Sequence, residues 1–361
     1  MKNHPRFSLS SRQASGFTLV EIMVSLAVLT ILLLISAQVI GQVQSTWSAS
    51  NARTTQFKEA RTAFDILSRN ISQATLNTYI DYDTNYLATA GGGAAAAAAP
   101  SNYIRKSDLH FQTGKASTLV PAGGGGSFTP GHAVFFQAPL GISNDPTLVG
   151  LDRLLCARGY FVQFSSDASW VPDFIPSQDF RYRYRLMEYS PPTEQNSIYA
   201  ANHANNGVIA PTWFAAAGGA ANAASNTIPT TRPVADNIVA LIISPRREPL
   251  SDDEQESATG PTQIAQNYAY DSSQPGNTQH LLPPLVRIVL IAIDEKSSVR
   301  MEELTGSKST PPLGDEITPI ISNAHELDQE VKEIVALLQT RRLNYRVFSA
   351  TVTLRGSKWS A

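Results

Sequence analysis

The amino-acid sequence predicts an α+β protein in which a long N-terminal helix is followed by a head rich in β-strands. One observation is an apolar segment, residues 22–40, within a stretch that has no charge between Glu21 and Arg53. Another is that no proline interrupts the chain between Pro5 and Pro100. The third is a series of short segments, later in the chain, that are rich in β-branched and aromatic residues. A chain of 361 residues is long enough for a head with a sizeable core.

The apolar segment is long enough to cross a membrane, since 19 helical residues span roughly 28 Å. Three basic residues and no acidic one precede Gly16, namely Lys2, Arg6 and Arg12. A secretory signal peptide would have a shorter apolar run, with its small-residue cleavage site after the run. Here the small residue, Gly16, stands before the run. A simple membrane anchor is the other interpretation, but it does not explain the acid Glu21 at the membrane face.

The residues from Gly16 to Glu21, Gly-Phe-Thr-Leu-Val-Glu, resemble the leader junction of type IV prepilins without a gap. The resemblance implies that residues 1–16 are a leader and that a prepilin peptidase cleaves after Gly16. Phe17 would then be the N-methylated mature N-terminus. Glu21 would pair with the amino terminus of a neighbouring subunit during assembly. A carboxylate in the hydrocarbon region is costly unless it is paired, which agrees with this role. The alternative is that Glu21 lies at the level of the lipid headgroups.

The charge distribution also predicts an orientation. Because the basic residues of the leader favour the cytoplasmic side, the large C-terminal part is expected outside the cytoplasm. We therefore expect a single-pass protein of the inner (cytoplasmic) membrane, with an extracytoplasmic head that can enter a surface or periplasmic filament. The partners that the resemblance implies are prepilin peptidase, other pilin-like subunits through the N-terminal helix, the inner membrane and the filament assembly machinery.

Helical periodicity continues beyond the apolar segment. The apolar side chains recur three and four residues apart, at Phe57, Ala60, Phe64, Leu67, Ile71 and Ala74. We expect one helix from about Phe17 to about Leu76, and two helices broken near Gly41 are the alternative. In either case the apolar face needs a partner surface, which the prepilin resemblance implies is a globular domain. The expected division is a leader (1–16), a transmembrane and assembly helix (17–41), its amphipathic continuation (42–78) and a periplasmic or extracellular α+β head (79–361).

The head is expected to contain an antiparallel β-sheet, packed on this helix and joined by long loops. Six segments have strand character: His132–Gln137, Gly159–Ser165, Phe180–Tyr189, Asn237–Ser244, Val286–Asp294 and Tyr345–Arg355. The nearly continuous apolar runs 238–243 and 286–293 indicate central strands that are buried on both faces. Two short helices are expected at Val299–Leu304 and Glu326–Arg341. Glycine- and alanine-rich tracts separate these segments, and we expect them to be loops within one domain.

The sequence contains few residues that indicate catalysis or ligand binding. We expect no catalytic residue, no cofactor and no metal site, because the familiar catalytic motifs are absent and the six histidines lack ligand spacing. Cys156 stands alone, so neither an intramolecular disulfide nor a cysteine–zinc site can form. The acidic residues 252–256 could offer oxygens to calcium, although a solvated loop is the simpler interpretation.

The charges do not favour nucleic acid as a partner, since the net charge is −2 and charged residues make up 16% of the chain. One segment could nevertheless contact nucleic acid. Arg181, Arg183 and Arg185 alternate with aromatic and apolar residues, which predicts a strand with a solvated arginine face. Such a face could touch phosphates, as in minor pilins that bind DNA.

Further stretches of the chain resemble two more specific families. The helix segment 60–74 resembles that of J-type minor pseudopilins of type II secretion. Residues 72–79, 291–297, 342–348 and 355–360 resemble the Verru_Chthon cassette protein C family, whose members are large prepilin-type proteins. These resemblances imply a non-enzymatic subunit, minor or at the tip, of a type IV pilus-like or type II secretion pseudopilus-like filament. The alternative is a membrane-anchored extracytoplasmic protein that binds DNA or a surface ligand and does not polymerise.

Overall fold

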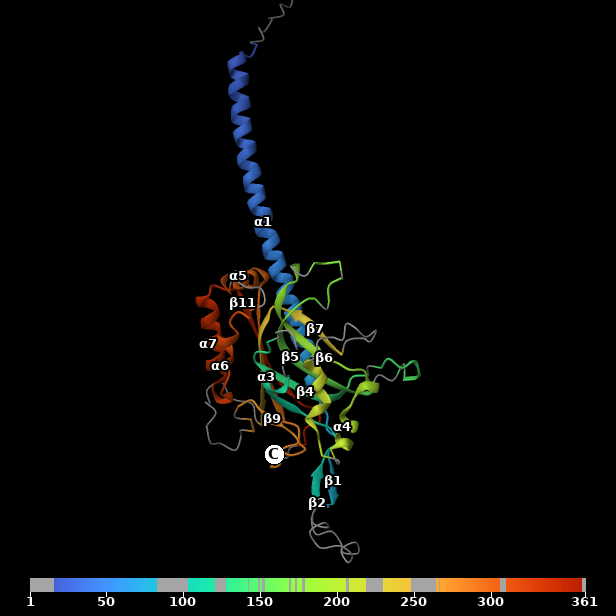
Figure 1. Ribbon diagram of the computed structural model, residues 1–361. Coiled ribbons are helices and arrows are strands. Elements are labelled where there is room, and N and C mark those ends of the chain that lie inside the picture. Colours follow the sequence, from blue (N-terminus) through green and yellow to red (C-terminus); the bar gives the residue numbers. More distant parts are fainter. Residues whose placement is uncertain are drawn as a thin grey trace, which may run out of the picture. The chain divides into compact units, whose positions relative to one another are not determined.

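The computed structural model describes most of the chain (Figure 1). The described residues are 16–82, 103–120, 128–141, 143–148, 150, 153–168, 170–172, 174–176, 179–205, 208–218, 230–247, 264–265, 267–305 and 310–358. The chain divides into two compact units, one up to Thr54 and one from Thr55 onward. The acidic residues 252–256 and the tracts 91–100 and 121–127 lie outside the described residues.

The N-terminal helix is continuous, as predicted. α1 (Leu19–Ser72) has 54 residues, and the alternative of a break near Gly41 is wrong. A single glycine inside a helix costs only about 1 kcal/mol relative to alanine, which 54 residues of helix tolerate. Thr18 caps the helix, because its Oγ1 accepts a hydrogen bond from the Glu21 N–H at 3.3 Å. Within the apolar segment the Ser25 and Thr30 hydroxyls donate to carbonyls four residues earlier, so their polar groups are satisfied inside the helix.

The second half of α1 buries the predicted apolar face. Leu67 and Ile71 are fully buried, together with Ala60, Ala63 and Phe64. The Phe64 ring lies 6.0 Å from the ring of Phe348 in β11 (Tyr345–Thr353). Just past the helix, the Thr75 N–H donates to the carbonyl of Gln137 in β4 (His132–Pro139). The partner surface that the sequence required is therefore formed by strands of both main sheets.

All strand pairs are antiparallel, in agreement with the predicted fold class. The larger sheet has the order β7-β6-β5-β4-β3-β9, and the smaller has the order β11-β10-β8. The remaining strands of the larger sheet are β3 (Gln112–Lys115), β5 (Leu155–Ser166), β6 (Tyr182–Tyr189), β7 (Thr231–Asp236) and β9 (Tyr270–Asp271). The smaller sheet adds β8 (Ile238–Arg246) and β10 (Leu285–Ile293). A separate pair joins β1 (Tyr79–Tyr82) to β2 (Tyr103–Lys106).

The six predicted strands are confirmed within a few residues at each end. The apolar run 286–293 forms β10, the central strand of its sheet, as expected. The run 238–243 forms β8, which lies at the edge of that sheet, so its predicted central position is wrong. β8 is nevertheless buried along its whole length, because it packs against β4, β5 and β6 of the larger sheet. The core therefore lies between the two sheets and the second half of α1.

A glycine permits a close aromatic contact within the larger sheet. Gly159 of β5 pairs with Phe135 of β4, and a Cβ on Gly159 would lie 2.3 Å from the Phe135 ring. The Phe135 ring also stacks on Phe214, with ring centroids 4.2 Å apart. Phe214 belongs to the 3₁₀ helix η5 (Pro211–Gly218), which covers this face of the sheet.

The late helices are close to those expected. The expected helix 326–341 corresponds to α7 (Leu327–Thr340), and the short one at 299–304 lies within α5 (Glu295–Thr305). Figure 1 shows α5, α6 (Gly314–Ile320) and α7 gathered beside β11. The remaining helical turns are α3 (Ala116–Leu119), η2 (Pro146–Leu148), η4 (Thr193–Gln195), α4 (Ile198–Ala204) and η6 (Ala324–Glu326).

The predicted solvated arginine face of β6 is wrong for Arg183 and Arg185, whereas Arg181, just before the strand, is exposed. Arg183 and Arg185 are only 5% and 4% exposed. Arg183 lies 2.9 Å from a Glu295 carboxylate oxygen and 3.2 Å from one of Glu302, both in α5. Arg185 pairs with Asp236 of β7 at 3.1 Å. Arg183 and Arg185 do lie on one face of the strand, but carboxylates from α5 and β7 cover that face instead of solvent.

Candidate functional site

The junction predicted for processing is accessible. Gly16 and Phe17 precede α1, and the Phe17 side chain is 78% exposed. No heavy atom of another described residue beyond the chain neighbours lies within 4 Å of the place where a Cβ on Gly16 would stand. The cap at Thr18 then begins the helix directly after the junction. A peptidase could therefore reach the Gly16–Phe17 bond without unfolding the helix, because exposed segments outside secondary structure are the usual sites of proteolysis.

Glu21 lies in the first turn of α1 and is exposed. An acid in the first turn is favoured by the helix dipole. The next charged residue along the helix is Arg53, 32 residues later and about 48 Å away at 1.5 Å per residue. No basic side chain of α1 before that point can neutralise the carboxylate. Within the described residues, the first part of α1 therefore supplies no counter-charge for Glu21.

The first half of α1 has the properties of a membrane-spanning segment. Within the described part of the chain, α1 is the one helix that is long and apolar enough to cross a membrane. The mean hydropathy of its most apolar window is 2.6, and none of that window is buried. Leu19, Leu26 and Leu33 are 75%, 57% and 61% exposed, for example. Apolar surface on this scale calls for lipid or other helices as its surroundings.

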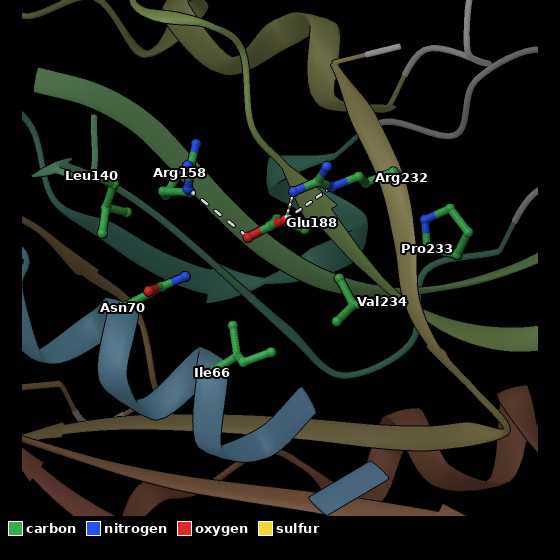
Figure 2. A pocket seen from close by; sticks show the side chains of 8 residues that line it. All are labelled: Ile66, Asn70, Leu140, Arg158, Glu188, Arg232, Pro233 and Val234. Atoms are coloured by element: carbon green, nitrogen blue, oxygen red, sulfur yellow. Dashed lines mark hydrogen bonds and ion pairs between the residues drawn. The ribbon is translucent and has the colours of Figure 1, made fainter. Parts of the chain in front are cut away.

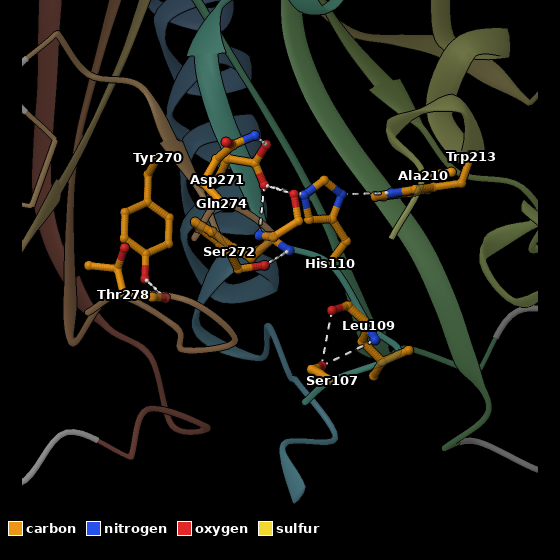
Figure 3. A network of polar contacts seen from close by, with 12 residues as sticks. Ser107, Leu109, His110, Ala210, Trp213, Tyr270, Asp271, Ser272, Gln274 and Thr278 are labelled. Atoms are coloured by element: carbon orange, nitrogen blue, oxygen red, sulfur yellow. Dashed lines mark hydrogen bonds and ion pairs between the residues drawn. The ribbon is translucent and has the colours of Figure 1, made fainter. Parts of the chain in front are cut away.

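The described part of the head contains a histidine–carboxylate pair of the kind that can act in catalysis (Figure 3). His110 Nε2 lies 2.7 Å from Asp271 Oδ1, and the ring is fully buried. The indole N–H of Trp213 donates to His110 Nδ1 at 3.1 Å. Because an indole nitrogen can only donate, His110 Nδ1 must accept, so Nε2 carries the proton and donates to Asp271. Burial alone would raise the pKa of Asp271, but hydrogen bonds from His110 and Ser273 lower it below its usual range.

This arrangement leaves the imidazole without a catalytic partner. Both ring nitrogens of His110 are occupied, one by a carboxylate and one by an indole, so no hydroxyl or thiol is activated. The pair instead links η5 to β9 through His110, which lies two residues before the start of β3. No local pattern in the sequence indicates this pair, since His110 and Asp271 are separated by 161 positions.

The other candidate residues are not gathered into a site. Cys156 is buried, and its Sγ lies 3.1 Å from Thr193 Oγ1. No group of three or more histidine, cysteine, aspartate or glutamate side chains among the described residues could hold a metal ion. His4 and the acidic residues 252–256 lie outside the described part of the chain.

Comparison with known proteins finds similarity at the N-terminus. The model of the prokaryotic N-terminal methylation motif matches residues 11–37. This range contains Gly16, Phe17 and Glu21 and the first half of the apolar helix. No curated protein and no solved structure matches the chain.

Proposed function

We propose that this protein is the precursor of a non-enzymatic, pilin-like structural subunit that is processed by prepilin peptidase. The observation that carries the proposal is the methylation motif at residues 11–37, which falls on an exposed glycine directly before a capped apolar helix. In this proposal the peptidase cleaves after Gly16 and Phe17 becomes the N-methylated mature N-terminus. The four expected segments, 1–16, 17–41, 42–78 and 79–361, then act as leader, membrane helix, amphipathic continuation and head.

The apolar helix has two environments in this scheme. It first holds the subunit in the inner membrane, with the head on the extracytoplasmic side. It then packs against equivalent helices in a filament, where Glu21 pairs with the amino group of Phe17 in a neighbouring subunit. The pairing would offset the cost of a carboxylate in apolar surroundings. The absence of a basic side chain in α1 before Arg53 supports an external partner.

The size of the head favours a minor or tip subunit, because a large head is harder to repeat densely along a filament. The filament would be type IV pilus-like or type II secretion pseudopilus-like, and the assembly machinery would be the further partner. The resemblance to the Verru_Chthon cassette protein C family belongs to the same proposal.

The mature N-terminus tests the processing step. The protein is produced in cells with and without a prepilin peptidase and analysed by intact-mass and peptide mass spectrometry. We expect a chain that begins with N-methylated Phe17 when the peptidase is present and an uncleaved chain when it is absent. A retained Met1 in the presence of an active peptidase, or cleavage after residue 40 by another enzyme, would contradict the proposal.

The alternative function is an anchored extracytoplasmic binding protein that never polymerises. Recognition of DNA by the arginines of β6 loses its support, because Arg183 and Arg185 are buried in ion pairs. The two functions differ in their dependence on processing. When cleavage is blocked, a pilin-like subunit should no longer enter a filament, whereas an anchored binding protein would keep its activity.

A further inference from the structure

A pocket of about 430 Å³ opens between the second half of α1 and the β5–β7 side of the larger sheet (Figure 2). Its size is in the range of small-molecule sites. The apolar part of its lining is formed by Ile66, Leu140, Pro233 and Val234. The polar part is formed by Asn70, Arg158, Glu188 and Arg232.

Glu188 is held by a chain of hydrogen bonds. Asn70 Nδ2 donates to the Tyr160 hydroxyl at 2.6 Å, and that hydroxyl donates to Glu188 Oε1 at 2.7 Å. The other carboxylate oxygen, Oε2, accepts from Arg232 Nε at 3.2 Å and from Arg232 Nη2 at 2.9 Å. Burial and the neighbouring carboxylate raise the pKa of Tyr160, so its hydroxyl keeps its proton. The carboxylate of Glu188 is thereby committed to Tyr160 and Arg232.

Arg158 is left with unused hydrogen-bonding capacity in this pocket. Its side chain is 3% exposed, and its Nη1 donates to the Ala157 carbonyl at 3.0 Å. Its Nε lies 3.9 Å from Glu188 Oε1, which is beyond hydrogen-bonding distance. Among the described residues, Nε has no hydrogen-bond partner. The charge of this enclosed guanidinium is only partly compensated by Glu188, and an acceptor bound in the pocket beside it would compensate the rest.

The charges of the pocket define what that acceptor should be. Two guanidinium groups face one carboxylate, which leaves one formal positive charge. A cation is therefore disfavoured. A phosphate dianion would change the net charge of the pocket from +1 to −1, in a largely apolar cleft. A single carboxylate would bring the net charge to zero. Guanidinium groups and carboxylates also match in geometry.

We propose that this pocket binds a small organic carboxylate, whose oxygens accept from Arg158 and whose apolar part lies against Ile66, Leu140 and Val234. The site does not depend on the proposed processing at Gly16. It would give the head a ligand-binding role in addition to its place in a filament.

The test uses 4-fluorobenzoate as the probe and ¹⁹F NMR as the readout. The full-length protein is kept in micelles of a non-ionic detergent, and protein-free micelles serve as the blank. The neutral, nearly isosteric 4-fluorobenzamide controls for apolar partitioning. We expect 4-fluorobenzoate to bind at least about 10-fold more tightly than the amide, because a charge-assisted hydrogen bond contributes about one such factor or more.

Two variants locate the binding. Arg158→Gln should weaken the binding of 4-fluorobenzoate at least about 10-fold and leave the affinity for the amide unchanged. Ile66→Glu changes a side chain that is 42% exposed on α1, so it should fold normally while placing a competing carboxylate at the pocket. It should also weaken the probe at least about 10-fold. Arg341→Gln removes an arginine outside the pocket and should leave the affinity for 4-fluorobenzoate unchanged.

Thermal unfolding of each variant separates loss of binding from loss of fold. If Arg158→Gln does not fold, Ile66→Glu decides the question. The proposal is overturned if the acid and the amide bind equally, if neither binds, or if folded Ile66→Glu binds 4-fluorobenzoate as the wild type does.

Discussion

The head should lose stability in mild acid because of one buried histidine. His132 opens β4, its side chain is buried, and its Nδ1 accepts a hydrogen bond from the Ile243 N–H at 3.2 Å. Among the described residues, its Nε2 has no hydrogen-bond partner. A second proton would have to sit on Nδ1, where it would face the Ile243 N–H. Burial, and to a lesser degree Lys115, lowers the pKa of His132 to about 3.

The sign and the size of the effect follow from this pKa. Between pH 6.5 and about 3 the unfolded chain binds a proton at His132 that the folded chain does not, so stability falls as the pH falls through this window. Each pH unit is worth about 1.4 kcal/mol. Because the unfolded histidine is only half protonated at pH 6.5, lowering the pH from 6.5 to 4.5 should remove about 2.3 kcal/mol through this residue alone. The result changes little if the folded pKa is as high as about 4, because pH 4.5 is still above it.

The assay is urea unfolding of the full-length protein in non-ionic micelles, followed by tryptophan fluorescence at pH 6.5 and pH 4.5. His132→Asn is the matched variant, since its Oδ1 can accept from the Ile243 N–H but does not titrate. Losses that come from carboxylates are common to both proteins and cancel in the difference. The wild type should lose about 2.3 kcal/mol more than His132→Asn. Equal losses in the two proteins would refute the reasoning.

Three other substitutions test the fold and the proposed assembly. Gly159→Ala places a methyl group against the Phe135 ring and should destabilise the head by about 1–3 kcal/mol in urea unfolding, whereas Gly41→Ala, in open space on α1, should not destabilise it. Leu67→Ala removes a fully buried side chain of α1 and should lower the unfolding free energy by about 2–5 kcal/mol, and a loss below 1 kcal/mol would argue against packing of this helix face on the sheets. Glu21→Gln should leave membrane insertion and cleavage intact but reduce the amount of subunit recovered in sheared filaments, and normal recovery would contradict the pairing of Glu21 with a neighbouring amino terminus.

The elements that the sequence predicted well have a strong local signal. α1 and β10 are long apolar or periodic segments, so the residues of each segment alone indicate which side chains are buried. Strands β1, β2, β3 and β9 were missed because each has four residues or fewer, too short for alternation to stand out. β7 was missed because it contains Pro233, which is tolerated there only because β7 is an edge strand.

The side-chain partners could not be predicted in the same way. Alternation placed Arg183 and Arg185 on one face of a strand, but only the tertiary structure supplies the carboxylates of Glu295 and Asp236 that cover them. The pocket beside Arg158 likewise combines residues from α1, β5, β6 and β7, and no spacing in the sequence links them. The junction at Gly16 is the opposite case, because its residues are contiguous and its signal is complete in six positions.

In the proposed function, processing at that junction must precede assembly for an electrostatic reason. Before cleavage the nitrogen of Phe17 belongs to a neutral peptide bond, and no basic side chain lies between Glu21 and Arg53. A carboxylate in this state is best placed at the headgroup layer, where water and lipid headgroups solvate it. Cleavage after Gly16 creates an amino group, and methylation of an amine keeps its positive charge. Only then does the apolar helix supply the cation that allows the Glu21 of another subunit to leave the headgroup layer, so an uncleaved subunit should insert into the membrane yet fail to pack into a filament.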